Sequence, residues 1–194
     1  MELMDIVYWF LGFGLLIVVI VLIFSSGRKK KTKKAFEVIP SFSPTHLFCS
    51  DDSATGVAID TSQNKIAFSD QKRKIIVYDY RQIHSVETVI DGNAIYKTNR
   101  GSQVIGAAVG GLLLGGAGLL IGALTGKKQK DEKVSKISIR VGVSDMDKPS
   151  HEIIFYDSQP IKRDGLVAQM WAEQADEWTQ RFNAILSFKE GMLK

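Results

Sequence analysis

The sequence is poor in the residues that build disulfide-stapled or metal-dependent folds. Of its 194 residues, one is cysteine, Cys49, and three are histidine. A single cysteine excludes an internal disulfide, which fits a reducing compartment. His46, His84 and His151 lie far apart in the chain and show no metal-ligand spacing. No set of nucleophile, base and oxyanion-stabilising groups can be assembled, so we expect a protein that is not an enzyme and uses no cofactor.

Two long apolar runs supply much of the 45% hydrophobic content. The first, Ile6 to Phe24, is almost purely aliphatic and aromatic. A helix over these nineteen residues is roughly 28 Å long, close to the hydrocarbon thickness of a bilayer. No basic residue precedes the run and a cationic stretch follows it, which predicts an uncleaved transmembrane anchor rather than a signal peptide. The positive-inside rule then places Met1 outside and the rest of the chain in the cytoplasm.

Six cations follow the first apolar run. Their place directly beside a predicted span favours setting the topology and attracting anionic lipid headgroups over specific nucleic-acid binding, which we do not expect. The members of this basic collar are Arg28, Lys29, Lys30, Lys31, Lys33 and Lys34. The proline-containing stretch that follows, residues 35–45, is predicted to be a linker.

The body of the chain has the pattern of antiparallel strands followed by one helix. Residues 75–80 are β-branched and aromatic, residues 137–143 alternate apolar and polar, and Asp91-Gly92-Asn93 is a hairpin signal. From Val167 to Ile185, apolar residues recur every three or four positions. This predicts an amphipathic helix, with Asp164 as its N-cap, that packs on the sheet. The alternative is that this helix lies on the membrane surface.

The second apolar run, Val104 to Leu124, has neither a charge nor a hydroxyl group and contains seven glycines. In water, each glycine costs a helix interior about 1 kcal/mol relative to alanine. In a membrane, glycine at every fourth position lets two helices approach closely. The spacing therefore predicts membrane insertion or oligomerisation through Gly106, Gly110, Gly111, Gly115, Gly118, Gly122 and Gly126.

Three arrangements of the second run remain open. It can be one transmembrane helix, a re-entrant helical hairpin with its turn near Gly115, or a hairpin packed on the sheet outside the membrane. A single span would separate strands that must pair, and both flanks are basic, with Lys97 and Arg100 before the run and Lys127 and Lys128 after it. Since basic flanks stay in the cytoplasm, these features favour the re-entrant hairpin.

The series of strands that ends in a tryptophan-bearing helix resembles the pleckstrin-homology (PH)-like superfamily, including its bacterial and GRAM-like members. The resemblance covers residues 45–188 and includes the stretch Ile75 to Val86. The glycine run is similar to that of small bacterial and phage proteins that carry a glycine-zipper hairpin between strands of such a domain. The implied fold class is a membrane-anchored α+β protein. It has an N-terminal transmembrane helix, a PH-like antiparallel β-barrel or sandwich, a C-terminal amphipathic helix and an inserted Gly-rich helical hairpin.

The predicted organisation follows from these segments. Residues 1–27 form the anchor, 28–45 the basic collar and linker, 46–188 the PH-like domain, 102–127 the glycine-zipper membrane hairpin within it, and 189–194 a tail. We expect a non-enzymatic protein of the bacterial cytoplasmic (inner) membrane that presents its PH-like domain on the inner face. Expected partners are the lipid bilayer, further copies of the chain through the hairpin, and an unidentified membrane or phage protein.

Two more specific functions fit the same architecture. One is a prophage-encoded superinfection-exclusion factor that stops phage DNA at the inner membrane. The other is a pore-forming subunit, although a pore needs a polar lining that the glycine run lacks.

Overall fold

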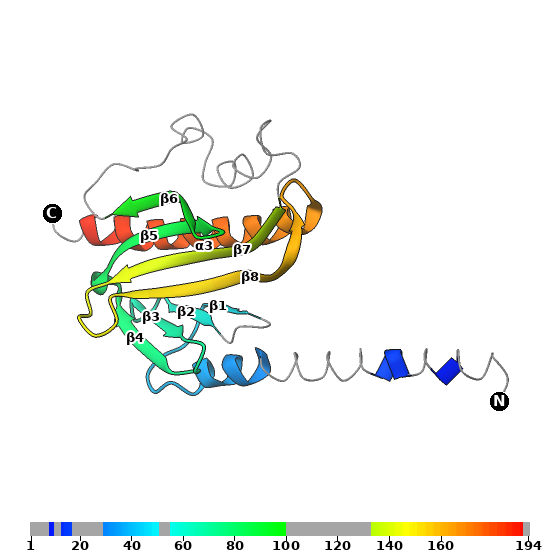
Figure 1. The fold of residues 1–194 in the computed structure, drawn as a ribbon. Helices are drawn as coiled ribbons and strands as arrows, with labels where there is room; N and C mark the ends of the chain where they lie inside the picture. Colours follow the sequence, from blue (N-terminus) through cyan, green and yellow to red (C-terminus); the bar gives the residue numbers. More distant parts are fainter. Residues whose placement is uncertain (1–7, 10–12, 17–28, 51–54, 100–132, 192–194) are drawn as a thin grey trace.

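The chain folds as two antiparallel sheets and a long C-terminal helix (Figure 1). The computed structural model describes residues 8–9, 13–16, 29–50, 55–99 and 133–191. The elements in these ranges are β1 (His46–Cys49), β2 (Gly56–Asp60), β3 (Lys65–Ser69), β4 (Ile75–Asp79), the 3-10 helix η1 (Tyr80–Gln82), β5 (Ile83–Ile90), β6 (Asn93–Asn99), β7 (Lys133–Val143), β8 (Ser150–Lys162) and α3 (Leu166–Gly191).

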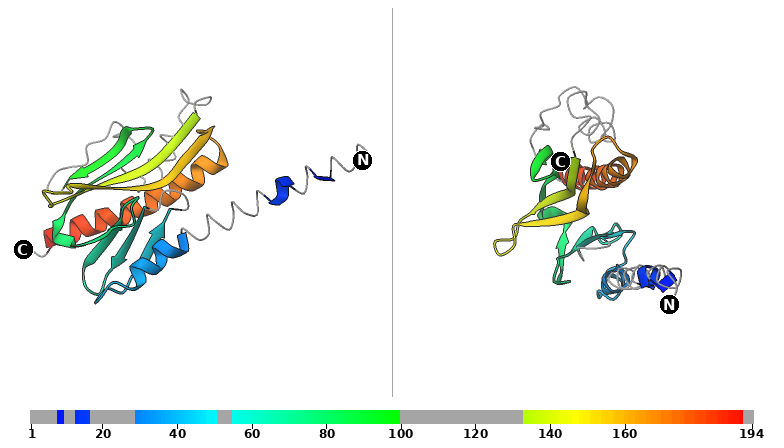
Figure 2. Two further views of the ribbon diagram at one scale, coloured as in Figure 1. Left: turned by 60° about the horizontal axis from the view of Figure 1, so that its bottom comes forward. Right: turned by 45° about the vertical axis from the view of Figure 1, so that its right-hand side comes forward.

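Each sheet has four strands, and all neighbours within a sheet are antiparallel. The first sheet has the order β1-β2-β3-β4 and the second the order β6-β5-β7-β8. Residues alternate between the two faces of a strand, so one set of apolar side chains from each sheet enters a common core. This core also contains the inner face of α3, which runs along the second sheet (Figure 2).

The predicted C-terminal helix is present and packs in the core through a stripe of small and aromatic residues. Phe182 stacks with Phe68 of β3 at 6.2 Å between ring centroids, and Trp178 meets Phe48 of β1 edge-on at 6.4 Å. Val167, which the periodicity assigns to this stripe, is exposed instead. Gln169 N donates to Gly165 O, so Gly165 takes the place of the predicted N-cap Asp164 and the helix begins at Leu166, one residue later than predicted.

The predicted fold class is wrong in its N-terminal transmembrane helix. Among the residues that the structure describes, no helix is long and apolar enough to cross a membrane. The described fold is instead mainly β-sheet with a C-terminal helix. The predicted hairpin at 102–127 lies outside the described residues.

A short helix covers the outer face of the first sheet. Residues 29–37, within the segment assigned to the collar and linker, are helical. We call them the collar helix. Phe36 of this helix is fully buried against the cross-strand pair Ala58 and Ala67 of β2 and β3. Gly56 permits this close contact, because a Cβ atom there would lie 3.0 Å from the Phe36 ring. The central strands β2 and β3 are therefore buried on both faces.

Candidate functional site

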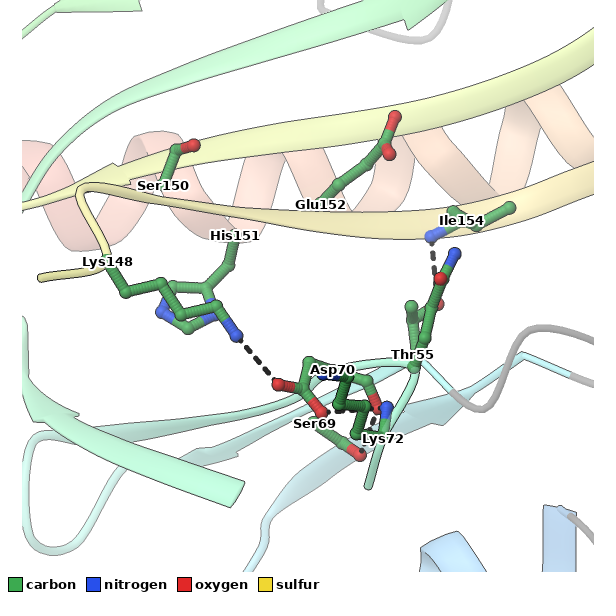
Figure 3. Close-up of a pocket in the computed structure, with 10 residues that line it drawn as sticks. Thr55, Ser69, Asp70, Lys72, Lys148, Ser150, His151, Glu152 and Ile154 are labelled. Atoms are coloured by element: carbon green, nitrogen blue, oxygen red, sulfur yellow. Dashed lines mark hydrogen bonds and ion pairs between the residues drawn. The ribbon is translucent and has the colours of Figure 1, made fainter. Parts of the chain in front are cut away.

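A polar cavity of about 440 Å³ lies where the β3–β4 turn and the start of β2 face β8 (Figure 3). It is bounded by strands of both sheets, because β8 is the edge strand of the second sheet. The Thr55 hydroxyl accepts a hydrogen bond of 3.2 Å from the backbone N–H of Ile154 and so joins β2 to β8 at one side. The lining residues are Thr55, Ser69, Asp70, Gln71, Lys72, Lys148, Ser150, His151, Glu152 and Ile154.

An ion pair crosses the mouth of this cavity. Lys148 Nζ lies 3.0 Å from Asp70 Oδ2 and links the β7–β8 turn to the β3–β4 turn (Figure 3). Asp70 also accepts hydrogen bonds from the backbone N–H groups of Lys72 and Lys74, each at 2.9 Å. Burial raises the pKa of Asp70, but these bonds and the Lys148 charge outweigh it, and the net pKa is lowered. Asp70 is therefore ionised, and its ion pair with Lys148 links the two sheets.

Behind the ion pair, a buried chain of hydrogen bonds connects β8 to β4. The Tyr78 hydroxyl donates to Asp145 Oδ2 at 2.8 Å and therefore accepts from His151 Nε2, which lies 2.9 Å away. The His151 ring also stacks on Phe68, with 4.5 Å between ring centroids. This geometry requires a proton on Nε2 of His151, and the low pKa of the ring leaves Nδ1 unprotonated at neutral pH.

Burial and neighbouring charges shift the pKa values of His151, Tyr78 and Asp145. Burial lowers the pKa of His151 to about 4, and the Lys148 ammonium adds to the shift, although Asp145 and Asp70 oppose it. Burial raises the pKa of Tyr78 far above its usual value, and Asp145 raises it further. The hydrogen bond from Tyr78 lowers the pKa of Asp145. At neutral pH no member is close to its pKa, so the chain favours a structural tie over proton transfer.

The cavity suits the binding of a small polar group. Its two ammonium groups, Lys72 and Lys148, are balanced by the carboxylates of Asp70 and Glu152. Glu152 is already engaged, because it accepts from Lys136 Nζ at 3.0 Å and from the Ser138 hydroxyl at 2.8 Å. In the described parts of the chain, no cluster of three His, Cys, Asp or Glu side chains could hold a metal ion.

The predicted site residues fall into two groups. The collar lysines from position 29 onward lie on the helix of residues 29–37 and are exposed, while Thr32 between them is buried. Arg28 and the seven predicted zipper glycines lie outside the described residues: Gly106, Gly110, Gly111, Gly115, Gly118, Gly122 and Gly126.

The strands that flank the glycine run fix where its ends must be. β6 and β7 both pair antiparallel with β5, so they are parallel to each other. Asn99 at the end of β6 is level with Gly142 of β7, because both face Ser85. Lys133 begins β7 nine residues from Gly142, which is roughly 30 Å along the strand. The chain between these strands leaves one end of the sheet and returns at the other.

Sequence reasoning missed the link between His151, Tyr78 and Asp145. Residues 78 and 151 are 73 positions apart, and the pattern around each indicates a strand rather than a site. The one local signal was Asp145 in a turn, where its Oδ1 accepts from the backbone N–H groups of Asp147 and Lys148. Only the pairing of the strands brings these groups together.

The comparison with protein families gives one match. The family described as "Glycine zipper containing PH domain" matches residues 46–157, from the start of β1 into β8. The match therefore covers more than half of the chain and includes both sheets and the glycine run.

Two related proteins come from a phage and a prophage. The immunity protein of Bacillus phage SPbeta is 27% identical over 140 residues, which is 61% of this chain and 68% of that protein. The SPbeta prophage-derived uncharacterized membrane protein YomJ of Bacillus subtilis (strain 168) is also 27% identical over 140 residues, 61% of this chain and 60% of that protein. The matched region thus spans less than two thirds of YomJ. No solved structure matches the chain.

Proposed function

Because the chain belongs to the family of glycine-zipper-containing PH domains, we propose that it is a membrane protein that protects a bacterium against superinfecting phage. In this proposal the protein is not an enzyme. Its PH-like domain lies on the inner face of the cytoplasmic membrane, and the glycine zipper contacts the bilayer or other copies of the chain. The observation that carries the proposal is a glycine-rich run set between two strands of one PH-like sheet.

The position of the run supports contact with one side of a membrane. β6 and β7 belong to the same sheet, so the chain leaves and rejoins the domain on the same side of any bilayer. A single crossing would instead require the flanking strands to lie on opposite sides. A segment that enters the membrane and returns, or one that pairs with a second copy, satisfies this topology.

The names of the relatives support the biological role. One related protein is named an immunity protein of a phage, and the other a prophage-derived membrane protein. Both sequences match this chain at the same modest level. We infer that this chain has the same kind of role and that it hinders the passage of phage DNA at the membrane.

The polar cavity supports an interaction role for the domain. It offers charges of both signs in a space of about 440 Å³, but the protons of the neighbouring His151 and Tyr78 are held fixed. Such a cavity can accept a polar side chain or headgroup without chemical change. The partner in this proposal is a membrane or phage protein that the domain meets at the inner face.

The test expresses the full chain in a phage-sensitive Bacillus host. We expect the protein to remain with membranes after a carbonate wash and to lower the plating efficiency of SPbeta-type phages at least 100-fold. Phage adsorption should not change, because the proposed block acts after attachment. A protein found only in the soluble fraction, or cells that stay fully sensitive to a broad phage panel, would contradict the proposal.

A matched pair of variants ties the effect to the zipper. Gly110→Leu with Gly122→Leu adds bulk where close approach is needed, whereas Ala108→Leu with Ala123→Leu adds bulk away from the helix face of Gly110 and Gly122. We expect the glycine pair to abolish protection and the alanine pair to retain most of it. Equal losses in both pairs would show that the run tolerates no added volume and that glycine spacing is not the cause.

A further inference from the structure

The first two turns of α3 expose apolar side chains that have no role in the core. The exposed fractions are 85% for Leu166, 49% for Val167 and 53% for Met170. Positions 166 and 170 are one turn apart and lie on the same helix face, with position 167 beside them. We call these three residues the apolar corner. A group of exposed large apolar side chains, unlike a single one, marks an interaction surface.

Two lysines stand next to the apolar corner in an arrangement that does not favour folding. Lys133 at the start of β7 and Lys162 at the end of β8 are exposed and lie directly opposite each other in the strand register. Like charges at such positions repel and destabilise a sheet. Neither lysine forms an ion pair with an acidic residue in the described part of the chain. An anionic partner would remove this repulsion.

The same end of the molecule carries the start of the basic collar helix. In Figure 1 and in the left view of Figure 2, the start of the helix of residues 29–37, the start of α3, the start of β7 and the end of β8 all lie toward one end of the domain. The described collar lysines there are exposed: Lys29, Lys30, Lys31, Lys33 and Lys34. The first turn of α3 contains no acidic residue. The nearest acids in the sequence are Asp131 and Glu132 before β7, Asp164 before α3 and Glu173 beyond Met170, and they are fewer than the lysines.

We propose that this end of the domain rests on an anionic lipid surface, with the apolar corner inserted among the headgroups. Apolar side chains bordered by lysines match the two layers of a membrane interface, the acyl boundary and the anionic headgroups. A protein partner fits less well, because lysine is depleted and aromatic residues are enriched in protein–protein interfaces. The inference rests on the proposed membrane function and adds the orientation of the domain.

The test places an environment-sensitive probe at single positions of the full chain. Cys49 is the only cysteine and is buried, so a Cys49→Ala background accepts one new cysteine for labelling. The labelled variants are Leu166→Cys, Met170→Cys and, as a matched control, Met146→Cys in the β7–β8 turn at the other end of the sheet. Met146 is a fully exposed methionine, so it matches Met170 in chemistry and differs in place. The vesicles contain phosphatidylglycerol and phosphatidylethanolamine, with phosphatidylcholine vesicles as the neutral reference.

The expected result is a blue shift and at least a twofold gain in emission for probes at 166 and 170 on anionic vesicles, with quenching by spin-labelled lipid. The probe at 146 should stay unchanged, and Lys133→Glu with Lys162→Glu should reduce the gain at 170.

A vesicle-bound protein whose 166 and 170 probes do not respond would overturn the inference but leave the proposed function intact. A response that depends on protein concentration without lipid would assign the corner to a second copy. Failure of the whole chain to bind membranes would overturn the proposed function itself.

Discussion

Among single side chains, His151 has the surroundings that most restrict its chemistry. It is buried, stacked on Phe68 and bonded to Tyr78, and its burial disfavours the charged form of the ring. In the unfolded chain the same imidazole titrates near its ordinary pKa of about 6.5. The folded pKa is about 4, so protonation favours the unfolded state between these two values.

The stability of the domain should therefore depend on pH in a defined window. Above pH 6.5 His151 is neutral in both states, and its contribution to stability is complete. As the pH falls from 6.5 toward 4, the free energy of unfolding should drop by up to about 1.4 kcal/mol per pH unit from this group. Urea unfolding at a series of pH values measures the slope. His151→Gln should flatten it, whereas the exposed His46→Gln should not.

Tyr78 joins the two ends of this hydrogen-bonded chain, so removing its hydroxyl should affect both. Tyr78→Phe leaves His151 without its acceptor and Asp145 without its donor. An unsatisfied buried group costs about 1–3 kcal/mol, and we expect a loss of that size in chemical denaturation. The control is Tyr156→Phe, because the Tyr156 hydroxyl donates to the carbonyl of Gln159 in the same strand, at an exposed position. Equal stability of the two variants would show that the buried chain does not hold the sheets together.

At the level of elements, Phe36 is the larger of the two buried side chains, Thr32 and Phe36, that attach the collar helix to the first sheet. Phe36 fills the space over Ala58 and Ala67, and the lysines on the other side of the helix face solvent. Phe36→Ala should release the helix and speed trypsin cleavage at the collar lysines at least tenfold. Large-to-small core changes of this kind cost about 3 kcal/mol. Val38→Ala, at an exposed position on the same segment, should leave the cleavage rate unchanged, and equal rates in both variants would contradict the packing.

The sequence predicts several elements because their signals are local. The alternation from Ile137 to Val143 lies within β7, and Asp91-Gly92 forms the β5–β6 turn with both residues at positive φ. The sequence pattern does not predict the collar helix, because five of its residues are lysines and only Thr32 and Phe36 are buried. Its apolar partners are supplied by distant strands, so no local periodicity reports them.

The candidate site was less predictable than the fold. The ion pair of Asp70 with Lys148 and the bond of Tyr78 to His151 join segments 73 to 78 positions apart. Each residue alone resembles an ordinary turn or strand residue, and only the pairing of the strands brings these side chains together. Val167 shows the opposite error, because its place in a helical repeat predicted burial where the core has already ended.

For the whole molecule, the domain and its glycine run act together in the proposed function. If the zipper assembles copies of the chain, cross-linking in membranes should give a ladder of oligomers from the wild type. Gly110→Leu with Gly122→Leu should reduce the ladder to monomer, because leucine prevents close backbone approach. Ala108→Leu with Ala123→Leu should keep it. An unchanged ladder in the glycine variant would assign assembly to another surface.

The most direct test of protection at the membrane follows phage DNA itself. Cells that express the full chain are infected with phage carrying fluorescent DNA, and adsorbed particles and internal DNA are counted in the same cells. Our account predicts normal adsorption with at least a tenfold drop in internal DNA, and recovery of DNA delivery in the variant with leucine at positions 110 and 122. Normal delivery of DNA in cells that nevertheless survive infection would contradict it, because protection would then act after the membrane.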